Sequence, residues 1–126
     1  MKPADILVWE RFLTTYPDKY DTVDYDMGLI QDKTAESVAG DLQIAGDEQL
    51  YKYKVDVVGY YKGGIDIIEI KDKATPSTIG QISSYWVLYD KEIKPKVPTR
   101  AVIIAGEASP DMAMLTKEHD VLLLLV

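Results

Sequence analysis

The apolar residues near the start of the chain recur with the spacing of an α-helix. The apolar stripe consists of Ile6, Trp9, Leu13 and Tyr16, which lie three or four residues apart. Pro3 suits the first turn of a helix, where a backbone N–H is not needed, and Pro17 ends it. The pattern therefore predicts a helix over residues 3–16 that buries this stripe.

Several later segments have the pattern of β-strands, because their apolar residues alternate with polar ones or form short runs. Over residues 20–30, Val23, Tyr25 and Met27 occupy one face of a half-exposed strand. The other predicted strands cover residues 51–61, 65–71, 101–105 and 121–126.

Two further helices begin at a serine or threonine followed by proline, and they cover residues 75–91 and 109–120. Residues 31–50 show no clean period, and we expect a loop there with a helical turn near residues 34–38. The elements thus follow the order αβββαβαβ in one domain, residues 1–126. A hairpin followed by crossover helices predicts an α/β (α+β) protein with a central mixed sheet flanked by helices.

The composition excludes several kinds of site. The 126 residues are 47% hydrophobic and include no cysteine, so disulfides, cysteine-ligated zinc and cysteine nucleophiles are excluded. His119 is the single histidine and cannot form a two-histidine metal site. The apolar run at residues 121–126 is far shorter than the roughly 20 residues that span a bilayer, and the N-terminus lacks the pattern of a signal peptide. We therefore expect a cytoplasmic protein, in its own cell or in a viral host, with no membrane partner.

Three charged residues, Asp56, Glu69 and Lys71, interrupt the apolar strands of the predicted hairpin. Glu69 and Lys71 are two residues apart, so they project from the same strand face about 6.6 Å apart. We expect residues 63–64 to form the two-residue loop of this hairpin. Asp56 then lies opposite Lys71, on the same sheet face as Glu69, whereas a three-residue loop would place Asp56 on the other face.

Two carboxylates and a lysine on neighbouring strands suit the hydrolysis of a phosphodiester. Carboxylate oxygens bind Mg²⁺ or Mn²⁺, and such a metal activates water and neutralises charge on the phosphate. A lysine can orient the water, help to deprotonate it or stabilise the charge that develops. The alternative is structural: Lys71 forms only a salt bridge with Asp56 on an exposed sheet face.

Other charged residues fit structural roles. Glu92-Ile93-Lys94 repeats the Glu-Ile-Lys string at the end of a helix, where we expect it on the surface. Asp66 and Asp72 project from the strand face opposite the predicted site, because side chains alternate along a strand. Asp24 and Asp26 are expected on an exposed strand face.

The order of these motifs resembles a known family. Asp56 followed by Glu69-Ile70-Lys71 is similar to the signature of the PD-(D/E)XK nuclease superfamily, which has the restriction-endonuclease-like fold. Gln81 and Tyr85 on the next helix resemble a motif of RecB-type exonucleases. The strand, helix and strand in residues 100–125 resemble the C-terminal nuclease domain of archaeal mismatch endonucleases.

The resemblance assigns roles to individual residues. Asp56 and Glu69 would be metal ligands, with the Ile70 carbonyl as a third, and Lys71 would be the catalytic lysine. Family members often carry an acidic residue on the first helix that completes the metal site, and Glu10 is the candidate. The alternative for Glu10 is a residue at the edge of the buried stripe that pairs with a neighbouring lysine.

Gln81 and Tyr85 lie four residues apart on one helix face and would contact the substrate phosphate. Alternatively, they are an ordinary polar residue and a packed tyrosine. One position departs from the family, because Val55 stands where the motif is named for a proline.

The resemblance implies a metal-dependent DNA nuclease that uses Mg²⁺ or Mn²⁺. Two other functions stay open: a nuclease fold that binds or assembles without turnover, and a plain acidic interaction domain. The net charge of −7 argues against tight DNA binding by a lone monomer, so metal, a homo-oligomer or another protein would strengthen it. The basic residues that would have to gather for DNA binding include Lys52, Lys54, Lys94, Lys96 and Arg100.

Overall fold

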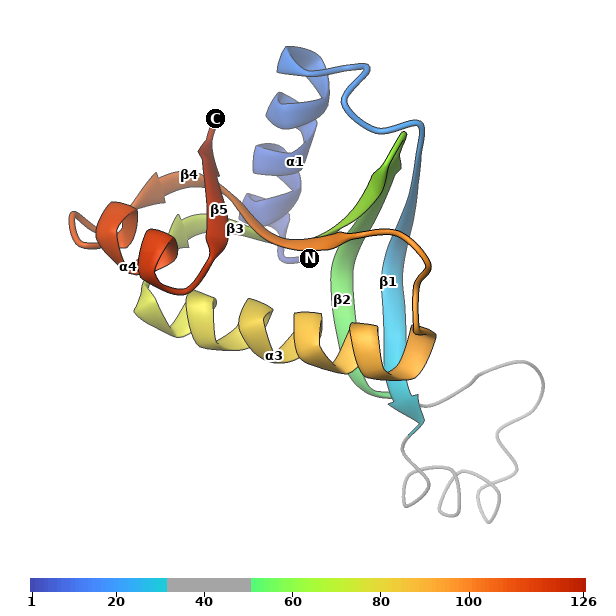
Figure 1. Ribbon diagram of the computed structural model, residues 1–126. Coiled ribbons are helices and arrows are strands. Elements are labelled where there is room, and N and C mark those ends of the chain that lie inside the picture. Colours follow the sequence, from blue (N-terminus) through green and yellow to red (C-terminus); the bar gives the residue numbers. More distant parts are fainter. Residues whose placement is uncertain (32–50) are drawn as a thin grey trace, which may run out of the picture.

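A computed structural model describes residues 1–31 and 51–126, and Figure 1 shows their path. The helices are α1 (Pro3–Thr15), α3 (Pro76–Ile93) and α4 (Met112–Glu118). The strands are β1 (Thr22–Gln31), β2 (Tyr51–Tyr61), β3 (Gly64–Ala74), β4 (Thr99–Ala108) and β5 (Val121–Leu125). The predicted order of these elements is confirmed. The loop and helical turn expected within residues 31–50 lie outside the described part of the chain, except that Gln31 ends β1.

All five strands belong to one sheet, in the order β1-β2-β3-β4-β5. The first two neighbouring pairs, β1–β2 and β2–β3, are antiparallel, whereas β3–β4 and β4–β5 are parallel. The helices α3 and α4 make the crossovers between the parallel strands, as that geometry requires. The predicted α/β (α+β) class, a mixed sheet flanked by helices, is therefore confirmed.

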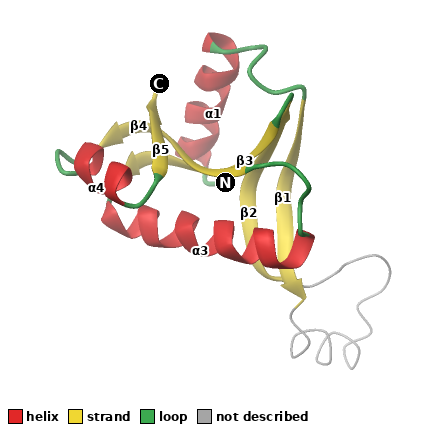
Figure 2. Cartoon of the chain, viewed as in Figure 1, coloured by secondary structure: helices red, strands yellow, loops and turns green. Residues whose placement is uncertain are grey.

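Helices α1 and α3 lie on opposite sides of the sheet (Figure 2), and the hydrophobic core has two parts, one on each face. On one face, α1 packs Val8 and Phe12 against Ile68 of β3. On the other face, α3 packs Ile79 and other residues against Ile67, the neighbour of Ile68. Although α3 is 18 residues long, no helix in the described part of the chain is apolar enough over such a length to cross a membrane.

The buried face of α1 differs from the predicted one. The buried residues of α1 are Asp5, Val8, Trp9 and Phe12. Ile6, Leu13 and Tyr16 of the predicted stripe are exposed. Apolar residues surround much of this helix, so spacing alone could not select its buried face. Asp5 is buried because its carboxylate accepts a hydrogen bond of 2.7 Å from the backbone N–H of Asp72, which ties the start of α1 to β3.

The β2–β3 hairpin turns one residue earlier than predicted. Tyr61 pairs with Gly64, so the loop consists of residues 62–63 and not 63–64. Gly63 has a φ of +97°, a conformation that residues with a side chain rarely adopt.

The earlier turn changes which residues of the hairpin lie opposite one another. Val58 pairs with Ile67, so by the same register Asp56 comes level with Glu69 and not with Lys71 as expected. A register change of two residues preserves the alternation of faces. The expected opposite partner of Asp56 is wrong. Its sheet face stays a prediction, because Val55 and Val57 on either side of it pack into different cores.

β1 changes faces at Asp26, which adopts a left-handed backbone conformation with a φ of 51°. Tyr25 lies on the α1 side, where its hydroxyl accepts a hydrogen bond of 3.0 Å from the tryptophan of α1. Met27 instead packs into the core on the α3 side. The expectation that both lie on one face is therefore wrong. The valines on either side of Asp56 in β2 divide between the two cores in the same way.

Candidate metal and catalytic site

The candidate site lies where β2 and β3 separate. Backbone pairing between the two strands runs from the turn to Val57 and Ile68. Beyond this point, Oδ2 of Asp56 accepts a hydrogen bond of 3.0 Å from the backbone N–H of Ile70. A side-chain carboxylate thus takes the place of a strand backbone, which holds Asp56 beside β3 as the strands diverge.

Glu69 is buried without being fully paired. Its side chain is only 3% exposed, and Oε1 lies 3.6 Å from Nζ of Lys71. Its other oxygen, Oε2, is buried and has no hydrogen-bond partner among the described residues. Burial, and next the negative charge of Asp56, raise the pKa of Glu69 to about 8, while Lys71 opposes the rise. Asp56 is therefore close enough to influence the protonation of Glu69.

These residues fit a divalent cation. A buried carboxylate oxygen without a partner is costly, and a hard cation such as Mg²⁺ binds oxygen ligands of this type. Asp56 and Glu69 offer one carboxylate each. Within the described residues, no group of three or more acidic or histidine side chains could hold a metal ion. The role predicted for the Ile70 carbonyl stays a prediction; its N–H is bonded to Asp56.

Glu10 is not brought to this pair. It is exposed on α1 and lines a hollow with Arg11, Thr14 and Val126. That helix packs on the sheet face of Ile68 and Ile70, whereas Glu69 and Lys71 alternate with these residues along β3 and so belong to the face that α3 covers. The burial of a different face of α1 turns Glu10 away, so its expected contribution to the metal site does not fit the structure.

Gln81 and Tyr85 lie together on α3. Nε2 of Gln81 donates a hydrogen bond of 3.1 Å to the hydroxyl of Tyr85, and the Tyr85 ring packs against Tyr53 of β2 at a centroid distance of 6.1 Å. Gln81 also lines one hollow with Lys71. The helix therefore presents Gln81 on the side of the predicted site, and Tyr85 both packs and positions it.

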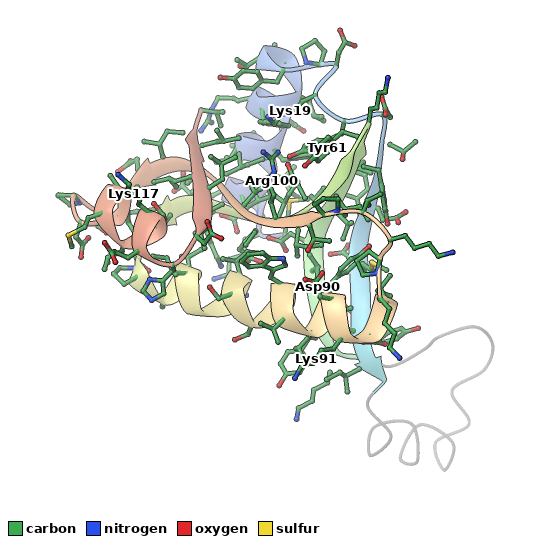
Figure 3. All side chains as sticks on the ribbon, viewed as in Figure 1. Lys19, Tyr61, Asp90, Lys91, Arg100 and Lys117 are labelled. Atoms are coloured by element: carbon green, nitrogen blue, oxygen red, sulfur yellow. The ribbon has the colours of Figure 1, made fainter. Side chains whose placement is uncertain are left out.

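Asp66, predicted to face away from the site, forms a separate network. It is fully buried and accepts hydrogen bonds of 2.8 and 2.9 Å from Arg100 and one of 2.6 Å from Tyr20. The Arg100 guanidinium also lies over the ring of Tyr61, 5.2 Å from its centroid, and Figure 3 labels this pair. Hydrogen bonding to Asp66 raises the pKa of Arg100, so the ion pair persists. Spacing along the sequence did not reveal this network, because Asp66 and Arg100 meet only through the β3–β4 register.

Comparisons of the whole chain with known proteins define its class of fold. No family model and no curated protein sequence matches it. Solved structures with the same arrangement of helices and strands do match, and they are endonucleases. The chain therefore has a restriction-endonuclease-like nuclease fold, as the resemblance implied.

Two of these structures are the EndoMS–dsDNA2 complex and a repair endonuclease from Pyrococcus abyssi. The first matches over 98% of this chain and 44% of its own, with a TM-score of 0.56 and 13% identity. The second matches over 82% of this chain and 48% of its own, with a TM-score of 0.50 and 17% identity. The chain thus spans less than half the length of either protein, and the identities support a shared fold.

Proposed function

We propose that this protein is a metal-dependent nuclease that hydrolyses phosphodiester bonds in DNA. The observation that carries the proposal is the buried, unpartnered Oε2 of Glu69 beside Asp56 and Lys71, at the point where two strands diverge. An arrangement made only for stability would have paired this oxygen, because a buried carboxylate without partners destabilises the fold. The nuclease fold of the chain supports the same function.

In this proposal, Asp56 and Glu69 hold Mg²⁺ or Mn²⁺ through their carboxylates. The metal, when bound, lowers the pKa of its water and neutralises charge on the phosphate. Lys71 is held near the carboxylates by Glu69 and orients the water or stabilises the charge that develops on the phosphate oxygens. Gln81 lines the same hollow as Lys71, so its amide group can donate a hydrogen bond to a phosphate there. Ionisation of Glu69 accompanies metal binding, because its pKa lies near 8 without metal.

DNA is the proposed substrate because one of the solved structures with this fold is a complex with double-stranded DNA. The same proposal includes a relation of this protein to EndoMS or to RecB-type exonucleases in particular. A net charge of −7 further argues that metal or a second subunit assists DNA binding.

The test is cleavage of labelled single-stranded, duplex and branched DNA with Mg²⁺, Mn²⁺ or chelator. We expect cleavage with metal, none with chelator, and cleavage about 10²–10³-fold slower by Glu69→Gln, which keeps the side-chain volume but removes the ligand charge. Circular dichroism of the variant controls for folding. Cleavage that persists in chelator, or at the wild-type rate in folded Glu69→Gln, would refute the proposed mechanism.

A second candidate function is DNA binding without turnover by the same fold. It is favoured by the presence of two, not three, carboxylates at the site within the described residues. DNA retention by a protein that never cleaves in Mg²⁺ or Mn²⁺ would select this function.

A further inference from the structure

A second group of basic side chains lies beside the proposed catalytic residues. Lys2, Lys71 and Lys73 line one hollow of about 380 Å³. The start of α3 contributes Thr75, Ser77, Thr78 and Gln81 to the same hollow. Lys73 follows Lys71 by two positions on β3, so both project from one strand face about 6.6 Å apart. Three lysines therefore converge where the proposed catalytic site opens.

The charges of two of these lysines are available to a ligand. In the described part of the chain, no carboxylate lies within 4.0 Å of the amino group of Lys2 or Lys73. Asp5 and Asp72 also line the hollow. The Asp5 carboxylate is already used, because it is 7% exposed and accepts the Asp72 backbone N–H. Among the residues that line the hollow, three lysines stand against two aspartates.

The basic residues that the sequence suggested for DNA contact lie elsewhere. Arg100 donates hydrogen bonds from Nε and Nη2 to Asp66. Lys94 follows the last residue of α3, and that helix of 18 residues is about 27 Å long, so Lys94 lies far from the hollow at its start. Lys52 lies over the ring of Tyr53. The hollow gathers three lysines, one of which is the proposed catalytic Lys71.

We propose that Lys73 and Lys2 form a second phosphate subsite, which holds the DNA phosphate next to the one that is cleaved. The inference rests on the proposed function. A nucleic-acid strand carries a phosphate at every nucleotide, so a strand with one phosphate at Lys71 must carry the next one a short step away. Lys73 stands one such step along β3. Each lysine acts as a compact point charge that neutralises one phosphate without reading the base.

The experiment measures binding separately from cleavage. Fluorescence anisotropy of labelled single-stranded and duplex DNA, with chelator present, gives affinity across a range of salt concentrations. For Lys73→Ala and Lys2→Ala, the plot of log affinity against log salt becomes flatter by about 0.7–0.9 for each lysine removed. The matched control is Lys62→Ala, an exposed lysine in the β2–β3 turn, which leaves the slope of the wild type. With Mg²⁺, Lys73→Ala also raises KM by a larger factor than it lowers kcat.

Each outcome decides the proposal. Suppose that wild type binds and cleaves DNA, and that the slope of log affinity against log salt is the same for Lys73→Ala and Lys62→Ala. This result overturns the subsite and leaves the proposed function standing. A wild type that neither binds nor cleaves DNA overturns both. Melting curves confirm that the variants fold, and Lys73→Gln, which keeps most of the side chain, replaces Lys73→Ala if the latter does not fold.

Discussion

Two buried acidic residues lie three positions apart on β3, and they differ in how completely they are paired. Asp66 accepts three hydrogen bonds, from Arg100 and Tyr20, and shares its guanidinium partner with the ring of Tyr61. Glu69 keeps one oxygen without a partner and has Lys71 only at 3.6 Å. The two residues face opposite sides of the same sheet.

This difference separates a structural acid from a functional one. A buried carboxylate that is fully satisfied joins elements of the fold, here β3, β4 and the segment before β1. A buried carboxylate left open raises the free energy of the metal-free protein until a ligand satisfies it. Burial alone does not distinguish them, since both are almost completely covered.

The largest expected effect comes from removing Glu69 or Lys71 in turn. Glu69→Gln and Lys71→Ala should each lower the cleavage rate by about 10²–10³-fold, the usual cost of losing one positioned electrostatic group. Metal affinity should fall with Glu69→Gln but not with Lys71→Ala, because only the first removes a ligand. Calorimetric titration with Mn²⁺ together with single-turnover cleavage measures both quantities. A folded Lys71→Ala variant with wild-type activity would contradict the distinction between Asp66 as a structural acid and Glu69 as a functional one.

The second prediction concerns the stability of the Asp66 network. Arg100→Leu leaves a buried carboxylate without its main partner, and such losses cost about 3–5 kcal/mol. Because the Arg100 side chain is 46% exposed, solvent compensates in part, and we expect a smaller loss of about 2–3 kcal/mol. Urea unfolding measures the change, and activity per folded molecule should fall far less than in the Glu69 variant. Equal losses of activity would mean that the two networks act as one.

The third prediction is a pH dependence of stability that Glu69 causes. Its pKa is about 8 in the folded protein and 4.5 in the reference state, so the folded protein retains a proton that the unfolded chain releases. This contribution to the free energy of unfolding is full below about pH 4.5 and is lost as the pH rises through about 8. A pKa difference of one corresponds to about 1.4 kcal/mol. The free energy of unfolding should therefore fall by at least this amount over that pH range.

Urea unfolding with chelator, at roughly pH 5 and roughly pH 8, measures this decline. Glu69→Gln should show a shallower decline than the wild type, since the amide does not titrate. Identical pH dependence in the two proteins would show that Glu69 is not held protonated by the fold.

The smallest effect is expected for Lys94→Ala, which alters the second Glu-Ile-Lys string. Lys94 lies after the end of α3, and Glu92 beside it accepts a hydrogen bond from the backbone N–H of Ile30. Changes at such surface positions are usually within about 0.5 kcal/mol, and the cleavage rate should stay close to that of the wild type. A loss as large as that of Lys71→Ala would show that the string, and not its place in the fold, determines activity.

The order of elements could be predicted from the sequence, but contacts that depend on tertiary packing could not. Alternation and caps locate strands and helices because they reflect local geometry. The apolar stripe of α1 was misassigned because several of its faces are apolar, and only the bond from Asp72 to Asp5 reveals the orientation. The change of faces at Asp26 depends on a left-handed residue inside a strand, which alternation cannot anticipate.

The residues of the candidate site could be predicted from the sequence better than their arrangement in space. The shared face of Glu69 and Lys71 follows from the period of a strand, and their ion pair confirms that closeness. The position of Asp56 depended on the register, which was wrong by two residues, so its expected partner changed. The sequence pattern does not distinguish Lys73, because a lysine on an exposed strand end is ordinary until the hollow beside it is known.

The tight β2–β3 turn also affects the order in which these parts of the molecule can form. Asp56 and Ile70 are 14 residues apart, whereas Asp66 and Arg100 are 34 apart and meet across parallel strands. Closing a short loop costs less chain entropy, and parallel pairing is slow because its partners are distant in sequence. The carboxylate pair therefore belongs to the most local contacts of the fold and can assemble with the hairpin. The Asp66–Arg100 network forms only after α3 has brought β4 back to the sheet.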